Sequence, residues 1–182
     1  MIKYLFILFF FLSINASLAN KKENIINNLK ETKNINFDFE QNINDKIEKG
    51  NCVIEYPKKI FCEYSVKNNK ILVSNGSSLV IKTNTSYYLY PLDKTPLYFI
   101  LDKNYLINKI YNLNERVIDE SFVNYKITEN GSEINIFFDK KSFNLIGWQT
   151  KDIYQNFNIT FLSSVKKNEL INENLFKLPL QN

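Results

Sequence analysis

Apolar and polar residues alternate along most of the chain, which is the pattern of half-buried β-strands. Around position 38, Phe37, Phe39 and Gln41 lie on one face of such a strand, and polar residues lie on the other. The same pattern predicts about ten strands in all. After the first, we expect them at 53–56, 60–64, 71–74 and 79–83, near 117–125, and at 125–127, 134–138, 145–148 and 157–162.

Turn signals connect these strands into consecutive hairpins. Pro57 lies between the second strand and the third, and the dipeptides Asn75-Gly76 and Asn130-Gly131 separate two further pairs. Asn-Gly favours a two-residue type I′ turn, because both residues tolerate a positive φ. Consecutive hairpins form an antiparallel meander, and a sheet with this many strands must curl or close.

Three segments interrupt the alternation and predict short helices. Residues 21–31 place apolar side chains at helical spacing. Thr95 as N-cap and Pro96 at the first helical position predict a very apolar helix over 96–101. The segment 105–113 is expected to be helical or irregular. The predicted fold is therefore mainly β with short helices, in the α+β class.

The N-terminus has the features of a cleaved secretory signal peptide. A single charge at Lys3 precedes a short apolar run, and small and polar residues lead to Ala19. The apolar run is shorter than the roughly 20 residues that cross a bilayer. Asn20 stands where a bacterial lipoprotein carries its acylated cysteine. We expect residues 1–19 to be removed and residues 20–182 to form one exported, soluble domain.

The composition excludes several classes of function. The chain has no histidine and one arginine, Arg116, so His-based hydrolytic triads and His-bearing zinc sites are excluded. Its four glycines form no phosphate-binding loop, and no carboxylate cluster has a calcium-loop spacing. The lysines and acidic residues are interspersed along the chain, and no basic block occurs. We expect no catalysis, no metal or other cofactor, and no nucleic-acid partner.

The two cysteines, Cys52 and Cys62, flank the turn at Pro57. If the turn centres on Pro57, they lie directly opposite each other on one face, where a cross-strand disulfide can join them. Export to an oxidising compartment favours this bond. Two buried free thiols and a redox role are the alternatives, and no Cys-x-x-Cys motif is present to favour the second.

Aromatic residues give the sheet a large apolar face that must be covered. The chain has 15 Phe, 11 Tyr and one Trp, but too few predicted helices to cover that face completely. In a barrel of this size the interior is either filled by side chains or holds a ligand. The helix at 96–101 is apolar on nearly all sides, so one side can lie on the sheet while another faces a cavity. A simply packed core fits the same pattern, and periodicity does not separate the two.

Several motifs, in order along nearly the whole exported chain, resemble the periplasmic outer-membrane lipoprotein carrier family, LolA. The segment 37–41, Phe-Asp-Phe-Glu-Gln, is similar to that family's first strand, and the segment from Gly50 to Pro57 resembles its Gly-x-aliphatic-x-x-x-Pro strand. The other similar segments are 60–64, the aliphatic-Val-Ser-Asn-Gly stretch at 72–79, the Thr-Pro helix region at 90–101, 145–152 and 175–179. No single motif is specific, but the ordered series is.

The resemblance implies an incompletely closed β-barrel with a helical lid over a hydrophobic cavity, which shields the acyl chains of a lipoprotein in the periplasm. It implies an inner-membrane ABC transporter as donor and an outer-membrane receptor as acceptor, and we expect a monomer. The residues expected to form the acyl-chain cavity and lid are Phe37, Phe39, Leu79, Ile81, Tyr88, Tyr90, Pro96, Leu97, Phe99, Ile100, Leu101, Ile136, Phe138, Trp148, Phe157, Ile159 and Phe161.

One position departs from the family pattern. Well-studied members carry an arginine immediately before the proline of the second strand, where it holds the lid shut, and this chain has Tyr56 at that lid-contact position. A phenol lacks the charged fork of a guanidinium. Two alternatives therefore stay open: a carrier of another lipid or glycolipid on the same fold, and a regulatory protein-binding domain of the envelope-stress sensor type.

Overall fold

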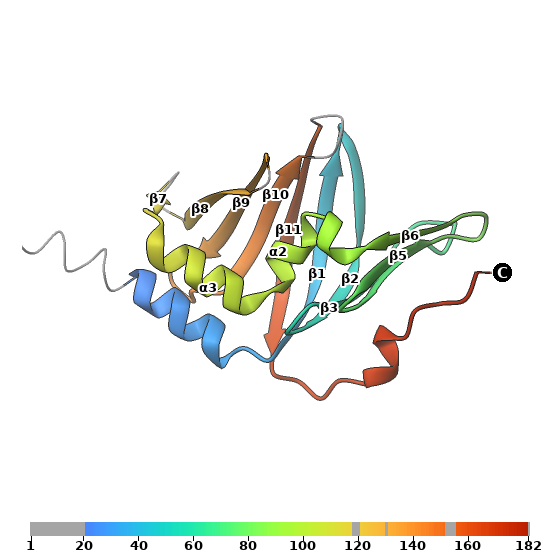
Figure 1. Ribbon diagram of the computed structural model, residues 1–182, viewed down its shortest axis with the longest axis horizontal. Helices are drawn as coiled ribbons and strands as arrows, with labels where there is room; N and C mark the ends of the chain where they lie inside the picture. Colours follow the sequence, from blue (N-terminus) through green and yellow to red (C-terminus); the bar gives the residue numbers. More distant parts are fainter. Residues whose placement is uncertain (1–20, 118–120, 130, 152–155, 182) are drawn as a thin grey trace, which may run out of the picture.

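The computed structural model describes residues 21–117, 121–129, 131–151 and 156–181, so the predicted signal peptide lies outside the described residues. The described strands form one antiparallel sheet, which Figure 1 shows with the helices in front of it. The strands are β1 (Asn34–Ile43), β2 (Lys46–Glu55), β3 (Lys59–Tyr64), β4 (Ile71–Asn75), β5 (Ser78–Lys82), β6 (Tyr87–Pro91), β7 (Arg116–Val117), β8 (Phe122–Glu129), β9 (Ser132–Asp139), β10 (Leu145–Lys151) and β11 (Phe157–Lys167).

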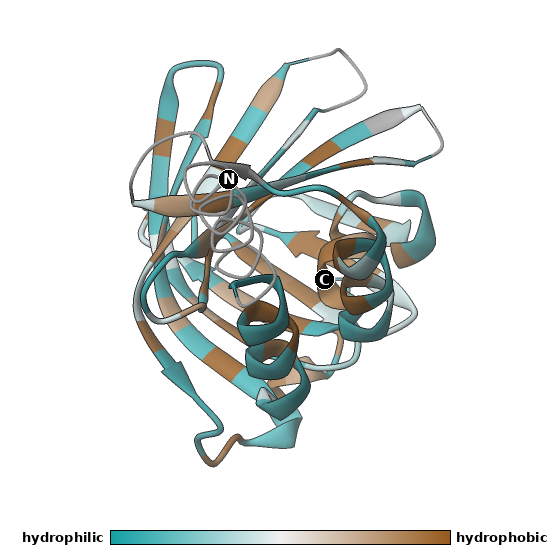
Figure 2. Cartoon of the chain, turned by 90° about the vertical axis from the view of Figure 1, so that its left-hand side faces the viewer, coloured by the Kyte–Doolittle hydropathy of each residue, from teal (hydrophilic) through white to brown (hydrophobic). Residues whose placement is uncertain are grey.

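The sheet is curved and open. Its eleven described strands follow the order β6-β5-β4-β3-β2-β1-β11-β10-β9-β8-β7. The pairing of β1 with β11 joins the first strand to the last at the centre of the sheet. Within the described residues, β6 and β7 are edges and do not pair with each other. Figure 2 shows the strands curving around the helices. The predicted fold class, a mainly β, curved and unclosed antiparallel sheet, is therefore confirmed.

Helices cover the inner, concave face of the sheet. One helix occupies residues 21–31, as predicted, and α3 (Lys103–Asn112) lies beside it (Figure 1). The Nζ of Lys22 joins the two by donating a hydrogen bond of 2.6 Å to the carbonyl of Leu113. No helix in the described part of the chain has the length and apolar character needed to span a bilayer. The shorter elements are η1 (Leu92–Lys94), α2 (Leu97–Leu101) and η2 (Glu173–Phe176).

The start of α2 differs from the prediction. The assignment of Thr95 as N-cap is wrong, because its hydroxyl donates to the carbonyl of Leu92 at 2.8 Å and so bonds to the preceding η1. Pro96 occupies the N-cap without a side-chain hydrogen bond. Most of the segment 105–113 belongs to α3, which ends at Asn112. Its N-cap Asp102 accepts a hydrogen bond of 3.1 Å from a backbone N–H of the first turn.

The turn at Asn75-Gly76 is wider than predicted. Ser74 pairs with Leu79, so the loop has more than the two residues of a type I′ turn. Gly76 has a positive φ of 98°, whereas Asn75 does not have a positive φ. The side-chain oxygen of Asn75 instead accepts hydrogen bonds of 3.0 Å from the backbone N–H groups two and three residues on. Asn is favoured in turns both because it tolerates a left-handed conformation and because its side chain bonds the nearby backbone. Here the second property stabilises the wider loop.

A two-residue turn of the predicted kind occurs at a position that the sequence reasoning missed. Asn44 and Asp45 have positive φ values of 50° and 63°, and they connect Ile43 to Lys46, which pair directly. This turn makes β2 begin earlier than the predicted range 53–56. At the second Asn-Gly dipeptide, the flanking residues of β8 and β9 pair, but Asn130 lies outside the described residues.

The main core lies between the inner face of the sheet and the two longer helices. Phe37 is 1% exposed, and its ring meets the Trp148 ring edge-on, with 6.3 Å between the ring centres. Apolar side chains of the N-terminal helix and of α3 pack into the same cluster; they are Ile25, Ile26, Leu29, Leu106 and Ile110. Side chains therefore fill the part of the inner face that these helices cover.

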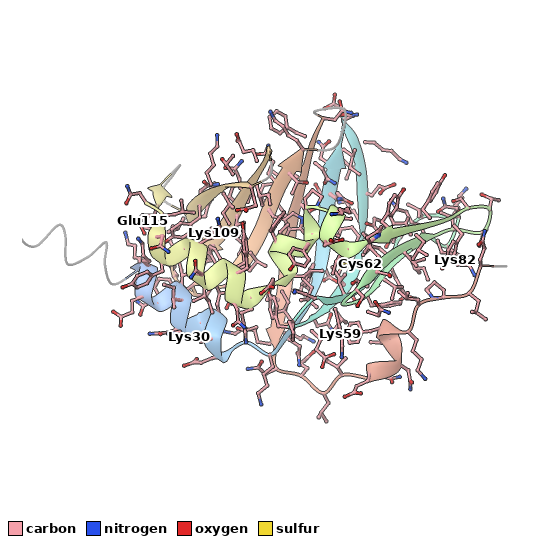
Figure 3. All side chains as sticks on the ribbon, viewed as in Figure 1. Lys30, Lys59, Cys62, Lys82, Lys109 and Glu115 are labelled. Carbon is pink, nitrogen blue, oxygen red and sulfur yellow. A yellow bond between two sulfur atoms is a disulfide. The ribbon has the colours of Figure 1, made fainter. Side chains whose placement is uncertain are left out.

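The C-terminal segment covers part of the outer face. Phe176 of η2 is buried, and the Lys59 ammonium lies 5.6 Å from the centre of its ring. The Nζ of Lys82 donates a hydrogen bond of 2.8 Å to the carbonyl of Leu180. Figure 3 shows both lysines on the side along which this segment runs. The outer face near β3, β4 and β5 is thus partly covered by chain that follows the sheet.

The cysteine hairpin is directly in register. Cys52 on β2 pairs with Cys62 on β3, both side chains are buried, and a disulfide joins them. Because Phe37 pairs with Cys52, the bond lies on the same inner face as the core aromatics. Its position therefore makes it part of the interior rather than of the exposed hairpin surface.

Candidate functional site

A cavity of about 250 Å³ lies between the start of α2 and the inner face of the sheet. Neither the N-terminal helix nor α3 contributes to its wall, so it lies beside the filled core rather than within it. The residues that line it are Phe39, Gln41, Ile43, Cys52, Ile60, Cys62, Tyr64, Lys70, Leu72, Leu79, Ile81, Thr95, Pro96, Leu97, Trp148, Thr150, Asn158 and Thr160.

Strand alternation makes one side of this cavity apolar. Successive side chains of a strand point to opposite faces, so β3 presents Ile60 and Cys62 to the cavity and β5 presents Leu79 and Ile81. The disulfide between Cys52 and Cys62 is part of the same wall. The first turn of α2 closes the opposite side, and Figure 3 shows Cys62 next to this helix. We call this surface the apolar wall.

The side formed by β1, β10 and β11 carries polar side chains among the apolar Phe39, Ile43 and Trp148. Gln41 Nε2 donates to Asn158 Oδ1 at 2.7 Å, and the Tyr64 hydroxyl donates to Gln41 Oε1 at 3.4 Å. Thr150 and Thr160 lie beside them on the cavity surface. The hydroxyl of Thr160 is buried and has no hydrogen-bond partner among the described residues. The cavity therefore has an apolar wall and a second wall that carries amides and hydroxyls.

An ion-pair network borders the polar side. Glu48 is 6% exposed and binds both Lys70 and, at 3.2 Å, Lys46. The Lys70 ammonium also lies 4.1 Å from the centre of the Tyr64 ring. Burial raises the pKa of Glu48, but the hydrogen bonds and charges of the two lysines outweigh burial, so this pKa lies below its usual value. Glu48 therefore stays ionised at neutral pH and holds Lys70 at the cavity surface.

The structure divides the predicted site residues into groups. Those that line the cavity are Phe39, Leu79, Ile81, Pro96, Leu97 and Trp148, together with Cys52 and Cys62. Those that are buried in the filled core and do not reach the cavity are Phe37, Ile100, Leu101, Ile136 and Phe138.

Three more predicted residues lie near the cavity but do not line it. Tyr88 and Tyr90 stack with 6.5 Å between ring centres and are exposed. They pair with Ile81 and Leu79, so they extend the inner face towards the edge of the sheet. Phe99 packs between α2 and α3, where its ring lies 5.1 Å from that of Tyr105.

The prediction for β11 placed the wrong face inward. Phe157, Ile159 and Phe161 lie on the outer face, and the alternate residues of this strand line the cavity. On the outer face, Phe161 pairs with Gly147 of β10. Its ring stacks on that of Phe137, which pairs with Gly147 from the other side, with 6.0 Å between ring centres. A Cβ on Gly147 would lie 2.6 Å from the backbone oxygen of Thr160, and 3.3 and 3.4 Å from these rings. The aromatic side chains therefore cover a glycine on the outer face.

Sequence reasoning did not identify the polar wall. Gln41 was assigned to the same face as Phe39, but its polarity kept it out of the predicted site. Asn158 and Thr160 lie outside the predicted site, because the sequence pattern favours their apolar neighbours on β11 as the inward residues. Lys70 had no local signal, since it precedes β4 and reaches the cavity through a long-range ion pair.

Lys58 connects α2 to the β2–β3 hairpin. Its Nζ lies 3.1 Å from Asp102 Oδ2 and donates to the Tyr98 hydroxyl at 3.2 Å. Its backbone N–H donates to the carbonyl of Leu101 at 2.9 Å. The hydrogen bond to Tyr98, and then that to Asp102, raise the pKa of Lys58 above its usual value. We call Lys58, Tyr98 and Asp102 the α2 latch.

Tyr56, the predicted lid-contact position, has a different environment. Its ring packs against the core, and the ammonium of Lys103 at the start of α3 lies 5.8 Å from the ring centre. Burial raises the pKa of the Tyr56 hydroxyl. The charged contact to α2 comes instead from Lys58, two residues further along the hairpin.

Removing the latch charge is expected to loosen α2. The ion pair is partly buried, and its loss in Lys58→Ala should cost about 1 kcal/mol. Opening of α2 should then increase about fivefold, which hydrogen exchange of the α2 amides measures. Lys59→Ala is the matched control, because it removes an ion pair with Glu55 on the same hairpin. Unchanged exchange in Lys58→Ala would contradict the role assigned to the latch.

A wider depression of about 900 Å³ crosses β1, β2, β3 and β11. Exposed charged side chains line much of it, among them Asp38, Glu40, Lys49 and Glu63. An apolar ligand would lie against hydrated charges there, so the cavity under α2 is the candidate site. The described residues contain no group of three or more cysteine or acidic side chains placed to hold a metal ion.

Comparison with known proteins agrees with the architecture. The family model described as outer membrane lipoprotein carrier protein LolA matches residues 30–179. No curated protein matches the chain. In fold, the chain is similar to a solved structure of the Pseudomonas aeruginosa MucA/MucB complex, with a TM-score of 0.51 and 10% identity, over 91% of this chain and 61% of that one.

Two further solved structures have lower TM-scores. One is a LolA superfamily protein from Nitrosomonas europaea, with a TM-score of 0.43 and 6% identity over 85% of this chain and 97% of that one. The other is the lipoprotein LppX from Mycobacterium tuberculosis, with a TM-score of 0.45 and 14% identity over 87% of this chain and 98% of that one. The family match itself extends from the N-terminal helix to the segment after η2. The chain therefore belongs to the outer membrane lipoprotein carrier protein family, LolA.

Proposed function

We propose that this protein is a periplasmic carrier, which shields the acyl chains of lipoproteins in the cavity under α2 and moves them from the inner to the outer membrane. The observation that carries the proposal is an apolar wall closed by a short helix, in a chain of the LolA family. Each buried methylene group contributes about 0.8 kcal/mol. Acyl chains therefore need such a cover in order to cross an aqueous compartment.

The size of the cavity implies that α2 moves when cargo binds. A volume of about 250 Å³ is below the roughly 300–1,000 Å³ of typical small-molecule sites, and several acyl chains need more space than one small molecule. Tyr88 and Tyr90 continue the inner face beyond the cavity and are exposed. A displaced α2 would open a continuous surface over these residues. Binding and release are then a shift between a self-packed and a filled cavity.

The proposal includes a route and partners. The N-terminal segment acts as a signal peptide and is cleaved after Ala19, and the carrier works as a monomer. An inner-membrane ABC transporter supplies the lipoprotein, and an outer-membrane receptor accepts it. The carrier makes and breaks no covalent bond, so its activity is binding and release alone.

Binding of an acylated peptide tests this function. Trp148 is the only tryptophan and lines the cavity, so its fluorescence reports on filling. A peptide with an acylated N-terminal cysteine should bind saturably and shift this emission, and the same peptide without acyl chains should not. Equal binding of both peptides would favour a protein-binding role. Binding of free lipids but not of the acylated peptide would favour a different lipid carrier.

A bulky side chain in the apolar wall should block binding. Ile81 is half-buried and lies one strand from the edge of the sheet, so a larger ring can occupy the cavity without displacing the main core. Ile81→Trp is expected to weaken binding of the acylated peptide at least tenfold, about 1.4 kcal/mol, as measured by titration calorimetry. Ile47→Trp, at an exposed residue on β2, should bind like the wild type. Wild-type affinity in Ile81→Trp would exclude this cavity.

A further inference from the structure

Polar side chains interrupt the inner face at one side of the cavity. Gln41, Asn158 and Thr160 lie at inward positions of β1 and β11, where a half-buried strand normally carries apolar residues. Buried polar groups destabilise a core unless they are hydrogen-bonded. Polar residues at core positions are therefore commonly retained for a function.

The register of three strands brings these groups together. Gln41 pairs with Thr160 across β1 and β11, and Thr150 on β10 pairs with Asn158. The bond between the two amides uses one of the four N–H groups that they carry. Thr160 is 4% exposed, and its hydroxyl has no partner in the described part of the chain. This wall therefore holds N–H and O–H donors that the described part of the chain leaves unused.

The wall is close to neutral. Lys70 is the charged residue among those that line the cavity, and its ammonium is paired with Glu48. The remaining polar lining residues are amides, hydroxyls and a phenol. A phosphate group would lack an unpaired cation here, whereas an uncharged carbonyl oxygen needs only N–H or O–H donors. The chemistry of the wall thus matches an uncharged acceptor.

We propose that the wall formed by Gln41, Asn158 and Thr160 binds the carbonyl groups of the ester or amide that links each acyl chain to the polar part of the ligand. This inference rests on the proposed function and gives the bound ligand a direction. The linkage lies against β1 and β11, and the chains extend along the apolar wall towards β5. A ligand without the carbonyl leaves buried donors unpaired, which is the basis of discrimination.

A matched pair of ligands tests the inference. The probes are a monoacylglycerol and the alkyl glyceryl ether of the same chain length, which lacks the carbonyl. Trp148 emission reports binding of both. The wild type should bind the ester about tenfold more tightly than the ether, as expected for one or two hydrogen bonds. An N-acyl ethanolamine of the same length forms a third arm, which shows whether an amide or an ester is preferred.

Variants assign the preference to the wall. Thr160→Val should reduce the ester-to-ether ratio to about threefold, and the double variant Gln41→Leu and Asn158→Leu should bring it close to one. In both cases affinity for the ether should stay within about twofold. The matched control is Asn135→Leu with Gln149→Leu, which removes a similar amide pair of 3.3 Å on the outer face. It should keep the wild-type ratio.

The outcomes separate this inference from the proposed function. Equal affinity of the wild type for ester and ether overturns the carbonyl subsite and leaves acyl-chain binding intact. A ratio that survives in both wall variants also overturns it. Failure of the wild type to bind either compound contradicts the proposed function itself. Thr160→Val keeps the shape of its side chain, so it tests the inference even if the double variant does not fold.

Discussion

Replacing Phe37 by alanine is expected to lower the free energy of unfolding by about 3–5 kcal/mol. The side chain is 1% exposed, meets Trp148 edge-on and lies across from Cys52. Its loss leaves a cavity where the filled core meets the candidate site. Domains of this size are typically stable by about 5–15 kcal/mol, so the variant should lose a large fraction of its stability. Urea denaturation measures the change.

Phe161→Ala is the control for this prediction. Phe161 is 48% exposed and stacks on Phe137 on the outer face, so its loss should cost about 1 kcal/mol. The two variants remove the same side chain from opposite faces of neighbouring strands. A larger loss for Phe161→Ala than for Phe37→Ala would contradict the assignment of inner and outer faces.

Loss of the disulfide is expected to lower the free energy of unfolding by about 3 kcal/mol. The two cysteines have a sequence separation of ten residues. The bond between them therefore closes a short loop and restricts the unfolded chain. The double variant Cys52→Ala and Cys62→Ala should therefore unfold at a lower urea concentration than the oxidised wild type. Because both cysteines line the cavity, the variant should also bind the acylated peptide more weakly.

A reducing agent provides the control for the disulfide. It should lower the urea midpoint of the wild type towards that of the double variant and leave the variant itself unchanged. If the reducing agent shifts neither protein, and the variant is as stable as the wild type, the bond does not stabilise the fold.

The strands could be predicted because alternation and hairpin signals act locally. The position of Pro57 between Cys52 and Cys62 was sufficient to place the cysteines opposite each other, and the structure has this register. The overall curvature also followed, since many consecutive antiparallel strands cannot stay flat. The helix at 21–31 followed from helical spacing. The helix before Asp102 was also predicted, but with Thr95 wrongly placed at its N-cap.

The face of a strand could not always be predicted from its own residues. The residues of β11 alternate on both faces, and the apolar set Phe157, Ile159 and Phe161 lies outside, where Phe161 pairs with Gly147 of the neighbouring strand. This choice depends on a partner strand. For the same reason, the inward positions of Asn158 and Thr160, which form the polar wall, could not be predicted from β11 alone.

The latch likewise depends on contacts between distant segments. Lys58 has a positive φ of 68° within the turn between β2 and β3. Its backbone N–H and its ammonium contact the end of α2. Position in the sequence pointed to Tyr56, which stands where family members carry an arginine. The structure instead provides a cation two residues later, so a charge still connects the hairpin to α2.

Protein recovered from the periplasm can show whether the cavity under α2 holds acyl chains in the cell. The wild type and Ile81→Trp would be purified in parallel without detergent, and bound molecules identified by native mass spectrometry. We expect acylated lipoproteins to accompany the wild type and to be depleted at least tenfold from Ile81→Trp. Recovery of the wild type without any acylated molecule, or equal amounts of cargo on both proteins, would contradict a carrier that holds acyl chains in the cavity under α2.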